Sequence, residues 1–415
     1  MSEAQTIKLD AARTADFEKS VREAMGCIQA VYTAAIEAVC GGAPRAQDVG
    51  ERFGIHRKLA WQVWNVAYAR EPAAGVRFMP SVRGIELWHD AAVKCGLARD
   101  LLDRLLETAT LFDRLVQTHA RDREMLELLV EACDPVADES AELRWRKQAF
   151  TGNCFVWGVR AKVMLACAFL HPARRAGFFD MVRVQGLIGL VRTRPNVRWP
   201  FAQSVIRMDS GEERRPQREP LMASADGPMA VPLMDRFCSR PLPPVQRRIG
   251  ELGLLEDELL PGPVGQTGEC TVITGELLRE VAPAYSPTGE MAMFGTGVRT
   301  PGELLICDQF VHRDLFAGVT RELHVYSELV SPVSRDERDR LPVSERLLHL
   351  GRGLTRVRTA DVPQYGELLE FVFERTGWNA DEFDVFRARL RYPPIPVSVM
   401  VRHEMPAPPP GLDLA

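Results

Sequence analysis

Four polar side chains follow one another at helical spacing near the start of the chain: Arg57, Lys58, Gln62 and Asn65. Arg and Lys bind phosphate oxygens or the acceptor atoms of guanine, and the amides of Gln and Asn can bond adenine through two contacts. Side chains three and four residues apart lie on the same side of a helix. The four residues, with Arg52 shortly before them, therefore predict a helix face suited to the backbone and base edges of a nucleic acid.

The segment that carries these residues predicts two short helices joined by a tight turn. Val49 and Phe53 lie one helical turn apart and face inward, and Gly50 is small at a position where two helices could cross closely. Gly54 can adopt the left-handed backbone conformation that a short helix–helix turn requires. The second helix would then have a buried side made of Ile55, Ala60 and Val63.

Residues 46–65 resemble the helix-turn-helix of bacterial DNA-binding proteins. The resemblance implies that the second helix lies in the major groove, with Arg57, Lys58, Gln62 and Asn65 toward the DNA. Six basic residues and a single acid, Glu71, lie between residues 52 and 83, so the local charge has the sign that DNA binding needs.

The motif departs from the usual pattern at two places. His56 stands where Ser or Thr usually precedes the recognition helix, and histidine is a poorer N-cap. Trp61 and Trp64 are bulky at positions that would face outward, and both could pack against Ile36 or Trp88 instead. In that alternative the two helices are only a hairpin within a larger helical bundle.

The charge of the chain is unevenly distributed. Residues 1–142 hold 17 basic and 23 acidic residues, residues 143–207 hold 12 and 1, and residues 208–415 hold 23 and 32, giving −6, +11 and −9. A segment this basic, with aromatic residues interleaved, attracts polyanions. Its candidate phosphate contacts are Arg144, Arg146, Lys147, Arg192, Arg194 and Arg198. The alternative is that these charges pair with acidic neighbours and that the aromatic residues belong to the core.

The sequence supports no catalytic, metal or cofactor site. No cysteine or histidine cluster has ligand spacing, and no motif of a serine hydrolase or a phosphate-binding loop is present. Asp308 and His312, four residues apart on a predicted strand, could form an acid–base pair, although a surface ion pair is the alternative that the pattern favours. An enzyme site built from Asp308, His312 and His324 has no positive support.

The expected fold class is α+β, with an all-helical unit at residues 1–138 and a larger mixed unit after it. Between them, residues 139–207 form the basic segment and residues 208–268 a proline-rich linker; residues 269–403 form the α+β unit and residues 404–415 a free tail. Helices are predicted at 344–350, 365–375 and 380–390, and strands at 270–274, 304–312, 322–329 and 396–402. Residues 159–170 fit a helix or a strand, and 181–191 a strand.

The nine cysteines are scattered along the chain and odd in number, which is typical of reduced thiols in the cytoplasm. No stretch is apolar enough for a membrane-spanning helix, so no membrane partner is expected. The apolar stripe of residues 97–118 predicts either an internal bundle contact or a homo-oligomer interface.

The leading hypothesis is a cytoplasmic DNA-binding regulator whose C-terminal unit senses a ligand or mediates oligomerisation. The alternative is an assembly protein, without nucleic-acid binding, whose segregated charges pair between domains or subunits.

Overall fold

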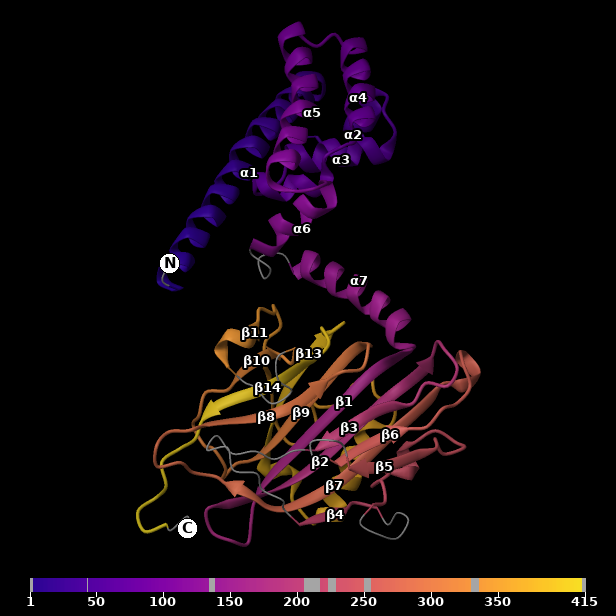
Figure 1. Ribbon diagram of the computed structural model, residues 1–415, viewed down its shortest axis with the longest axis vertical. Helices are drawn as coiled ribbons and strands as arrows, with labels where there is room; N and C mark the ends of the chain where they lie inside the picture. Colours follow the sequence, from indigo (N-terminus) through magenta and orange to yellow (C-terminus); the bar gives the residue numbers. More distant parts are fainter. Residues whose placement is uncertain are drawn as a thin grey trace. The chain divides into compact units, whose positions relative to one another are not determined.

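A computed structural model describes residues 3–42, 44–133, 139–204, 217–222, 229–249, 255–329 and 336–412. The chain divides into two compact units, unit 1 (Met1–Ala141) and unit 2 (Glu142–Ala415). Unit 1 is helical and unit 2 is built mainly from β-sheets, so the expected α+β class is confirmed (Figure 1). No helix among the described residues is both long enough and apolar enough to cross a membrane.

Unit 1 consists of helices joined by short turns. They are α1 (Glu3–Cys40), α2 (Ala46–Phe53), α3 (Arg57–Ala67), the 3₁₀ helix η1 (Pro72–Phe78), α4 (Val82–Lys94), α5 (Arg99–His119) and α6 (Arg123–Cys133), followed by the start of α7 (Glu139–Trp157). The first helix ends at a pair of glycines, Gly41 and Gly42. Gly41 has a φ of 72° and its N–H donates to the Glu37 carbonyl at 2.9 Å, because glycine adopts this left-handed conformation without a steric penalty.

The core of unit 1 forms where α1 meets the other helices. Met25, Tyr32 and Ile36 on α1 are fully buried, and Trp88 of α4 packs its ring edge-to-face against Tyr32 at 4.6 Å. α5 runs beside α1 (Figure 1) and buries the apolar stripe predicted for residues 97–118 against it. Leu105 is 0% exposed and Leu115 4% exposed, so the stripe is an internal bundle contact and is not available as a dimerisation face.

The described residues of unit 2 form three sheets. Its strands are β1 (Val159–Pro172), β2 (Phe178–Arg192), β3 (Trp199–Ser204), β4 (Arg218–Pro220), β5 (Val245–Ile249), β6 (Leu255–Leu259), β7 (Cys270–Pro283), β8 (Met291–Val298), β9 (Gly302–His312), β10 (Glu322–Ser327), β11 (Arg340–Leu341), β12 (Leu348–Arg352), β13 (Phe383–Arg391) and β14 (Val397–Glu404). Its helices are the rest of α7, α8 (Tyr365–Thr376) and the short 3₁₀ turns η2 (Asp235–Phe237), η3 (Gln266–Gly268), η4 (Glu337–Asp339) and η5 (Ala380–Glu382).

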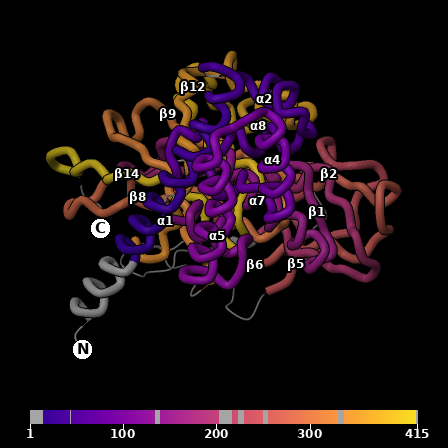
Figure 2. Tube along the Cα trace, turned by 90° about the horizontal axis from the view of Figure 1, so that it is seen from above, coloured from indigo at the N-terminus to yellow at the C-terminus, as the bar shows by residue number. Residues whose placement is uncertain are grey.

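The strands are ordered β12-β13-β9-β1-β2-β7-β4, β11-β10-β14-β8 and β3-β6-β5 in the three sheets. In the part of the chain that the structure describes, β1 and β9 form the only parallel strand ladder, for example with Met164 opposite Leu305. β8 and β14 lie side by side in both views (Figures 1 and 2).

Helix α8 packs on one face of the seven-stranded sheet through Leu368, Val372 and their neighbours. Residues of the four-stranded sheet such as Val325 and Val399 share a core with the opposite face, which explains why the central strands are apolar on both sides.

Two predicted helices are wrong. Residues 380–390 form the short turn η5 and then strand β13, which pairs antiparallel with β9 over its whole length. Residues 348–352 are strand β12 at the edge of the same sheet. In β13 the side chains of Phe383, Val385 and Ala388 are buried by the sheet and its neighbouring layers, so tertiary packing decides a segment whose local pattern fits either structure.

The predicted division of the second half also needs correction. The basic segment 139–207 is not separate, because β1 and β2 are central strands of the seven-stranded sheet. Within the proline-rich segment 208–268, β4 extends that sheet and β5 and β6 pair with each other; residues 205–216, 223–228 and 250–254 lie outside the described residues. The tail is held at its start, because the N–H of Met405 donates to the Glu290 carbonyl at 2.9 Å.

Candidate nucleic-acid interface

Helices α2 and α3 form the helix–turn–helix that the sequence predicts. The Asp48 carboxylate accepts a 2.8 Å hydrogen bond from the N–H of Arg45 at the start of α2. Gly54 ends α2 with a φ of 64°, and the N–H of Ile55 donates to the Gly50 carbonyl at 3.1 Å. His56 caps α3, since its Nδ1 accepts from the N–H of Lys58 at 3.2 Å. Histidine therefore performs the N-cap function that was expected to be weak here.

The two helices cross closely because Gly50 has no side chain. A methyl group at Gly50 would lie 3.3 Å from the Ala60 methyl group, tighter than ordinary carbon–carbon contact. Val49 and Phe53 of α2 and Val63 of α3 are buried in the core of unit 1, as predicted. Ile55 is half-buried in the turn. Val49, Phe53, Ala60 and Val63 are thus on the buried side predicted for a pair of helices joined by a tight turn, and Ile55 is only partly so.

One face of α3 is left toward solvent. At 100° per residue, positions 57, 58, 61, 62 and 65 fall within an arc of about 140° on the helix. Arg57 and Lys58 are exposed and Gln62 is half-buried, whereas Ala60, Val63 and Val66 point into the core. An α-helix with its side chains is about as wide as the major groove of B-DNA, so a face of this breadth could enter it.

The charge of this face is positive and unneutralised. Arg52, Arg57 and Lys58 form no ion pair among the described residues, whereas Arg45 lies 3.6 Å from Asp48. Helix α3 contains no acidic residue. The N-terminal end of a helix carries a partial positive charge, which adds to the basic side chains of the first turn and favours an anion there.

Trp61 and Asn65 occupy the middle of the exposed face. Trp61 is 50% exposed and packs its ring edge-to-face against Phe78 of η1, with 5.1 Å between the ring centroids. The ring that contacts Trp88 from the α2 side is that of Phe53, not that of Trp61. The Asn65 amide nitrogen donates to the Trp61 carbonyl at 2.7 Å, so one of its donors is used within the helix.

Trp64 points away from the exposed face. Its indole N–H donates to the Pro44 carbonyl at 2.7 Å, and its ring lies beside that of Tyr68. Trp61 and Phe78 were not among the predicted site residues. The helical period alone could have placed Trp61 with them, since it lies one turn from both Arg57 and Asn65.

Two of the six candidate phosphate contacts in residues 143–207, Arg146 and Arg192, are held within unit 2. Arg146 donates to Glu142 and to Glu345, each at 2.8 Å, and Arg192 is 3% exposed with hydrogen bonds to the Val197 and Leu260 carbonyls. These two guanidinium groups are structural, which corrects their assignment. Arg198 lies 3.7 Å from the buried Glu258.

The other three candidates differ in their surroundings. Lys147 and Arg194 are exposed, and Arg144 stacks on Trp145 at 5.5 Å. The aromatic residues of the segment are largely core, for example Phe178, Phe179 and Trp199. Pairing with acidic neighbours within unit 2 is observed for four basic residues of the segment: Arg146, Arg160, Arg183 and Arg198.

Asp308 is buried and belongs to the core of unit 2. It accepts hydrogen bonds from Arg387 at 2.7 and 2.6 Å and from the Tyr365 hydroxyl at 2.5 Å. Burial raises the pKa of Tyr365 well above its usual value, and the Asp308 charge adds to this, so the hydroxyl stays protonated and donates. Neither the acid–base pair with His312 nor a surface ion pair forms at Asp308.

The histidines considered with Asp308 lie elsewhere. His312 is 3.5 Å from Glu382, and its ring meets that of His171 edge-to-face at 4.8 Å. His324 lies on β10 in a different sheet and contacts Tyr326 and Glu322, each at 2.9 Å. The structure therefore does not bring Asp308, His312 and His324 together. The described residues also contain no group of three or more His, Cys, Asp or Glu side chains placed to hold a metal ion.

Comparisons with known proteins place the chain in no family. No protein-family model and no curated protein matches the chain. A crystal structure of a protein from Parabacteroides distasonis, described as a "putative protease", aligns with 59% of this chain at 9% identity and a TM-score of 0.25. The aligned part spans 40% of that chain, and a similarity this low carries no argument about fold or activity.

Proposed function

We propose that this protein binds DNA through the exposed face of α3 and acts as a transcriptional regulator. The observation that carries the proposal is the combination of a tight helix–turn–helix with an exposed first turn whose Arg57 and Lys58 have no ion-pair partner among the described residues. On a solvent-exposed helix face, basic side chains are usually accompanied by acidic side chains of opposite charge. Here α3 has none, and its N-terminal end adds a partial positive charge.

In this proposal Arg52, Arg57 and Lys58 contact phosphates or guanine, and Gln62 and Asn65 read base edges. Unit 2 would serve ligand sensing or oligomerisation, the role expected from the sequence. All nine cysteines are free, which agrees with the reducing cytoplasm as its location. Some of the basic residues on which the assembly-protein alternative depends pair inside unit 2, such as Arg183 with Glu276.

The test is the salt dependence of DNA binding by the full chain. Anisotropy of a labelled random-sequence duplex, measured over a salt series, should show affinity that falls steeply with ionic strength through counterion release. The double variant Arg57→Glu/Lys58→Glu should bind at least about tenfold more weakly and lose about two from the slope of log K against log salt.

A matched control keeps the same change in net charge. Arg104 and Arg114 lie on α5, are exposed and have no ion pair among the described residues, so Arg104→Glu/Arg114→Glu should leave DNA affinity within about threefold of the wild type. Absence of DNA binding at low salt, or equal losses in the two double variants, would refute the proposal.

A further inference from the structure

Trp61 places an apolar surface at the centre of the exposed face of α3. Its side chain is 50% exposed, and around the helix it lies about 40° from Arg57 and about 40° from Asn65. The indole therefore stands between a guanidinium group and an amide. Binding to phosphates alone needs basic side chains and has no use for an apolar ring, so the position of Trp61 favours contact with the bases.

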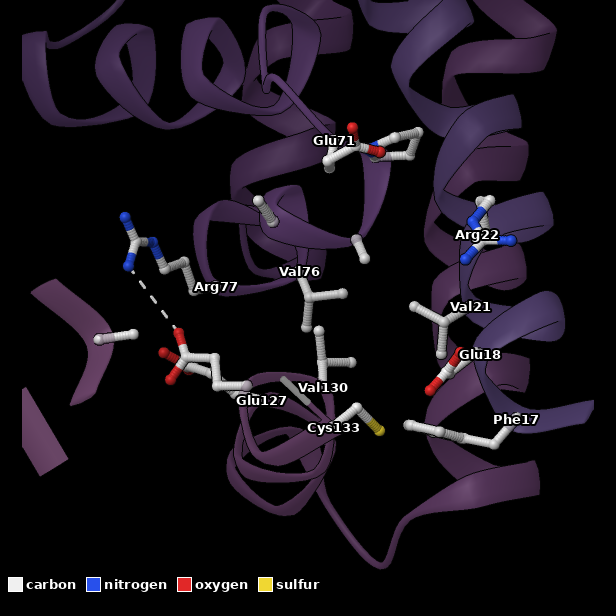
Figure 3. Close-up of a pocket in the computed structure, with 15 residues that line it drawn as sticks. Phe17, Glu18, Val21, Arg22, Glu71, Val76, Arg77, Glu127, Val130 and Cys133 are labelled. Carbon is white, nitrogen blue, oxygen red and sulfur yellow. Dashed lines mark ion pairs between the residues drawn. The ribbon is translucent and has the colours of Figure 1, made fainter. Parts of the chain in front are cut away.

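The 3₁₀ helix η1 fixes the position of the Trp61 ring. Phe78, the last residue of η1, packs edge-to-face against it, with 5.1 Å between the ring centroids, and also contacts the core of unit 1. η1 is anchored on its other side, where the buried Val76 faces Val21 of α1 and Val130 of α6 beside a cavity of about 500 Å³ (Figure 3). A ring that is already held in place loses little conformational entropy when it binds a partner.

The chemistry of the major groove identifies what an apolar ring can recognise there. Each base pair presents hydrogen-bond donors and acceptors along its edge, and only thymine adds an apolar substituent, its C5 methyl group. Arg57, Gln62 and Asn65 suit the donors and acceptors. The indole of Trp61 suits the methyl group, because contact between two apolar surfaces removes both from water.

An exposed indole can also stack on the bases of a single strand. Duplex DNA is favoured here, because α3 is the second helix of a helix–turn–helix and this helix enters the major groove of a duplex. The amides of Gln62 and Asn65 on the same face suit the edges of paired bases.

We propose that Trp61 reads the C5 methyl group of a thymine in the major groove, so that one position of the DNA site requires a 5-methylpyrimidine. This inference rests on the proposed DNA binding and names a residue that determines its specificity. Trp61 contacts the base, and Phe78 is a positioning residue that acts through Trp61. Burial of one methyl group against the indole should change the affinity about fourfold.

Duplexes that the full chain selects from a randomised library provide the DNA for the test. Each thymine of a selected duplex is replaced in turn by uracil, which removes only the methyl group. Anisotropy titrations should find at least one position at which the uracil duplex binds about fourfold more weakly. At that position 5-bromouracil, whose bromine is similar in size to a methyl group, should restore the affinity.

Variants of the protein assign the effect to Trp61. Trp61→Ala should bind the thymine and uracil duplexes equally, whereas Trp61→Phe, which keeps an aromatic ring, should retain most of the difference. Phe78→Leu should reduce the ratio of the two affinities, while a purely structural effect would weaken both duplexes alike. The matched control is Trp157→Ala, because Trp157 on α7 is 48% exposed and should leave the ratio unchanged.

The outcomes separate this inference from the proposed function. DNA binding in which no uracil replacement lowers the affinity by even about twofold would overturn the inference alone. Selected duplexes without a preferred thymine, an unchanged ratio in Trp61→Ala, or tighter binding of the single strand than of the duplex would do the same. If Trp61→Ala does not fold, the uracil duplexes decide, since they leave the protein unchanged. Absence of DNA binding at low salt would instead refute the proposed function.

Discussion

Replacing Arg387 by Met should destabilise unit 2 more than any surface substitution. Arg387 is the only cation among the described residues that bonds Asp308, through two hydrogen bonds of 2.7 and 2.6 Å, and Asp308 is 1% exposed. Arg387→Met removes this partner, and the carboxylate keeps only the Tyr365 hydroxyl. Breaking a buried ion pair from one side costs about 3–5 kcal/mol, because it leaves an uncompensated charge in the interior.

The loss can be assigned to unit 2, because β9 and β13 both belong to its seven-stranded sheet. Hydrogen exchange of peptides from β9 and β13, measured over a denaturant series, reports on unit 2 separately from unit 1.

A double variant that removes both members of the ion pair provides the control. Asp308→Leu combined with Arg387→Met removes both charges, so the double variant should recover about 2 kcal/mol or more relative to the sum of the single losses. A loss below about 1 kcal/mol for Arg387→Met, or strict additivity in the double variant, would show that the pair is not the buried network described above.

Two further predictions concern single backbone and side-chain positions. Gly54→Ala should destabilise unit 1 by about 1 kcal/mol and weaken DNA binding, because alanine is strained at a φ of 64°; unaltered thermal unfolding of the variant would contradict this. His403 is buried with no hydrogen-bond partner for either ring nitrogen among the described residues, and burial, aided by Arg321, lowers its pKa to about 3. The unfolded chain binds this proton more readily, so stability should fall by about 2 kcal/mol from pH 7 to pH 5 and be lost progressively between pH 6.5 and 3. His403→Phe should flatten this fall in denaturant titrations at several pH values, and an equally steep fall in the variant would count against it.

The helix–turn–helix was predictable because its determinants are local. Gly54 sets the turn, Gly50 allows the close crossing, and the 3.6-residue period separates the buried Val63 from the exposed Arg57 and Lys58. The strands around residues 181–191 and 304–312 follow from equally short-range patterns. Whether the exposed face binds DNA is not encoded in that pattern, since the same helix pair also serves packing alone.

Partners far apart in the chain could not be predicted in this way. Asp308 meets Arg387 because β9 and β13 pair in register, with 79 residues between the two positions. The cavity of unit 1 likewise needs α1, η1 and α6 to converge, and no local pattern records their distance.

The sequence by itself determined the fold class, the helical unit and the α2–α3 motif, because helix periods, glycine turns and caps act over a few residues. Only the tertiary structure decided that residues 380–390 contain a strand, that Arg146 and Arg192 are buried partners, and that the stripe on α5 is covered. These outcomes depend on which surfaces meet, and burial and long-range pairing outweigh the small local preferences of the segments involved.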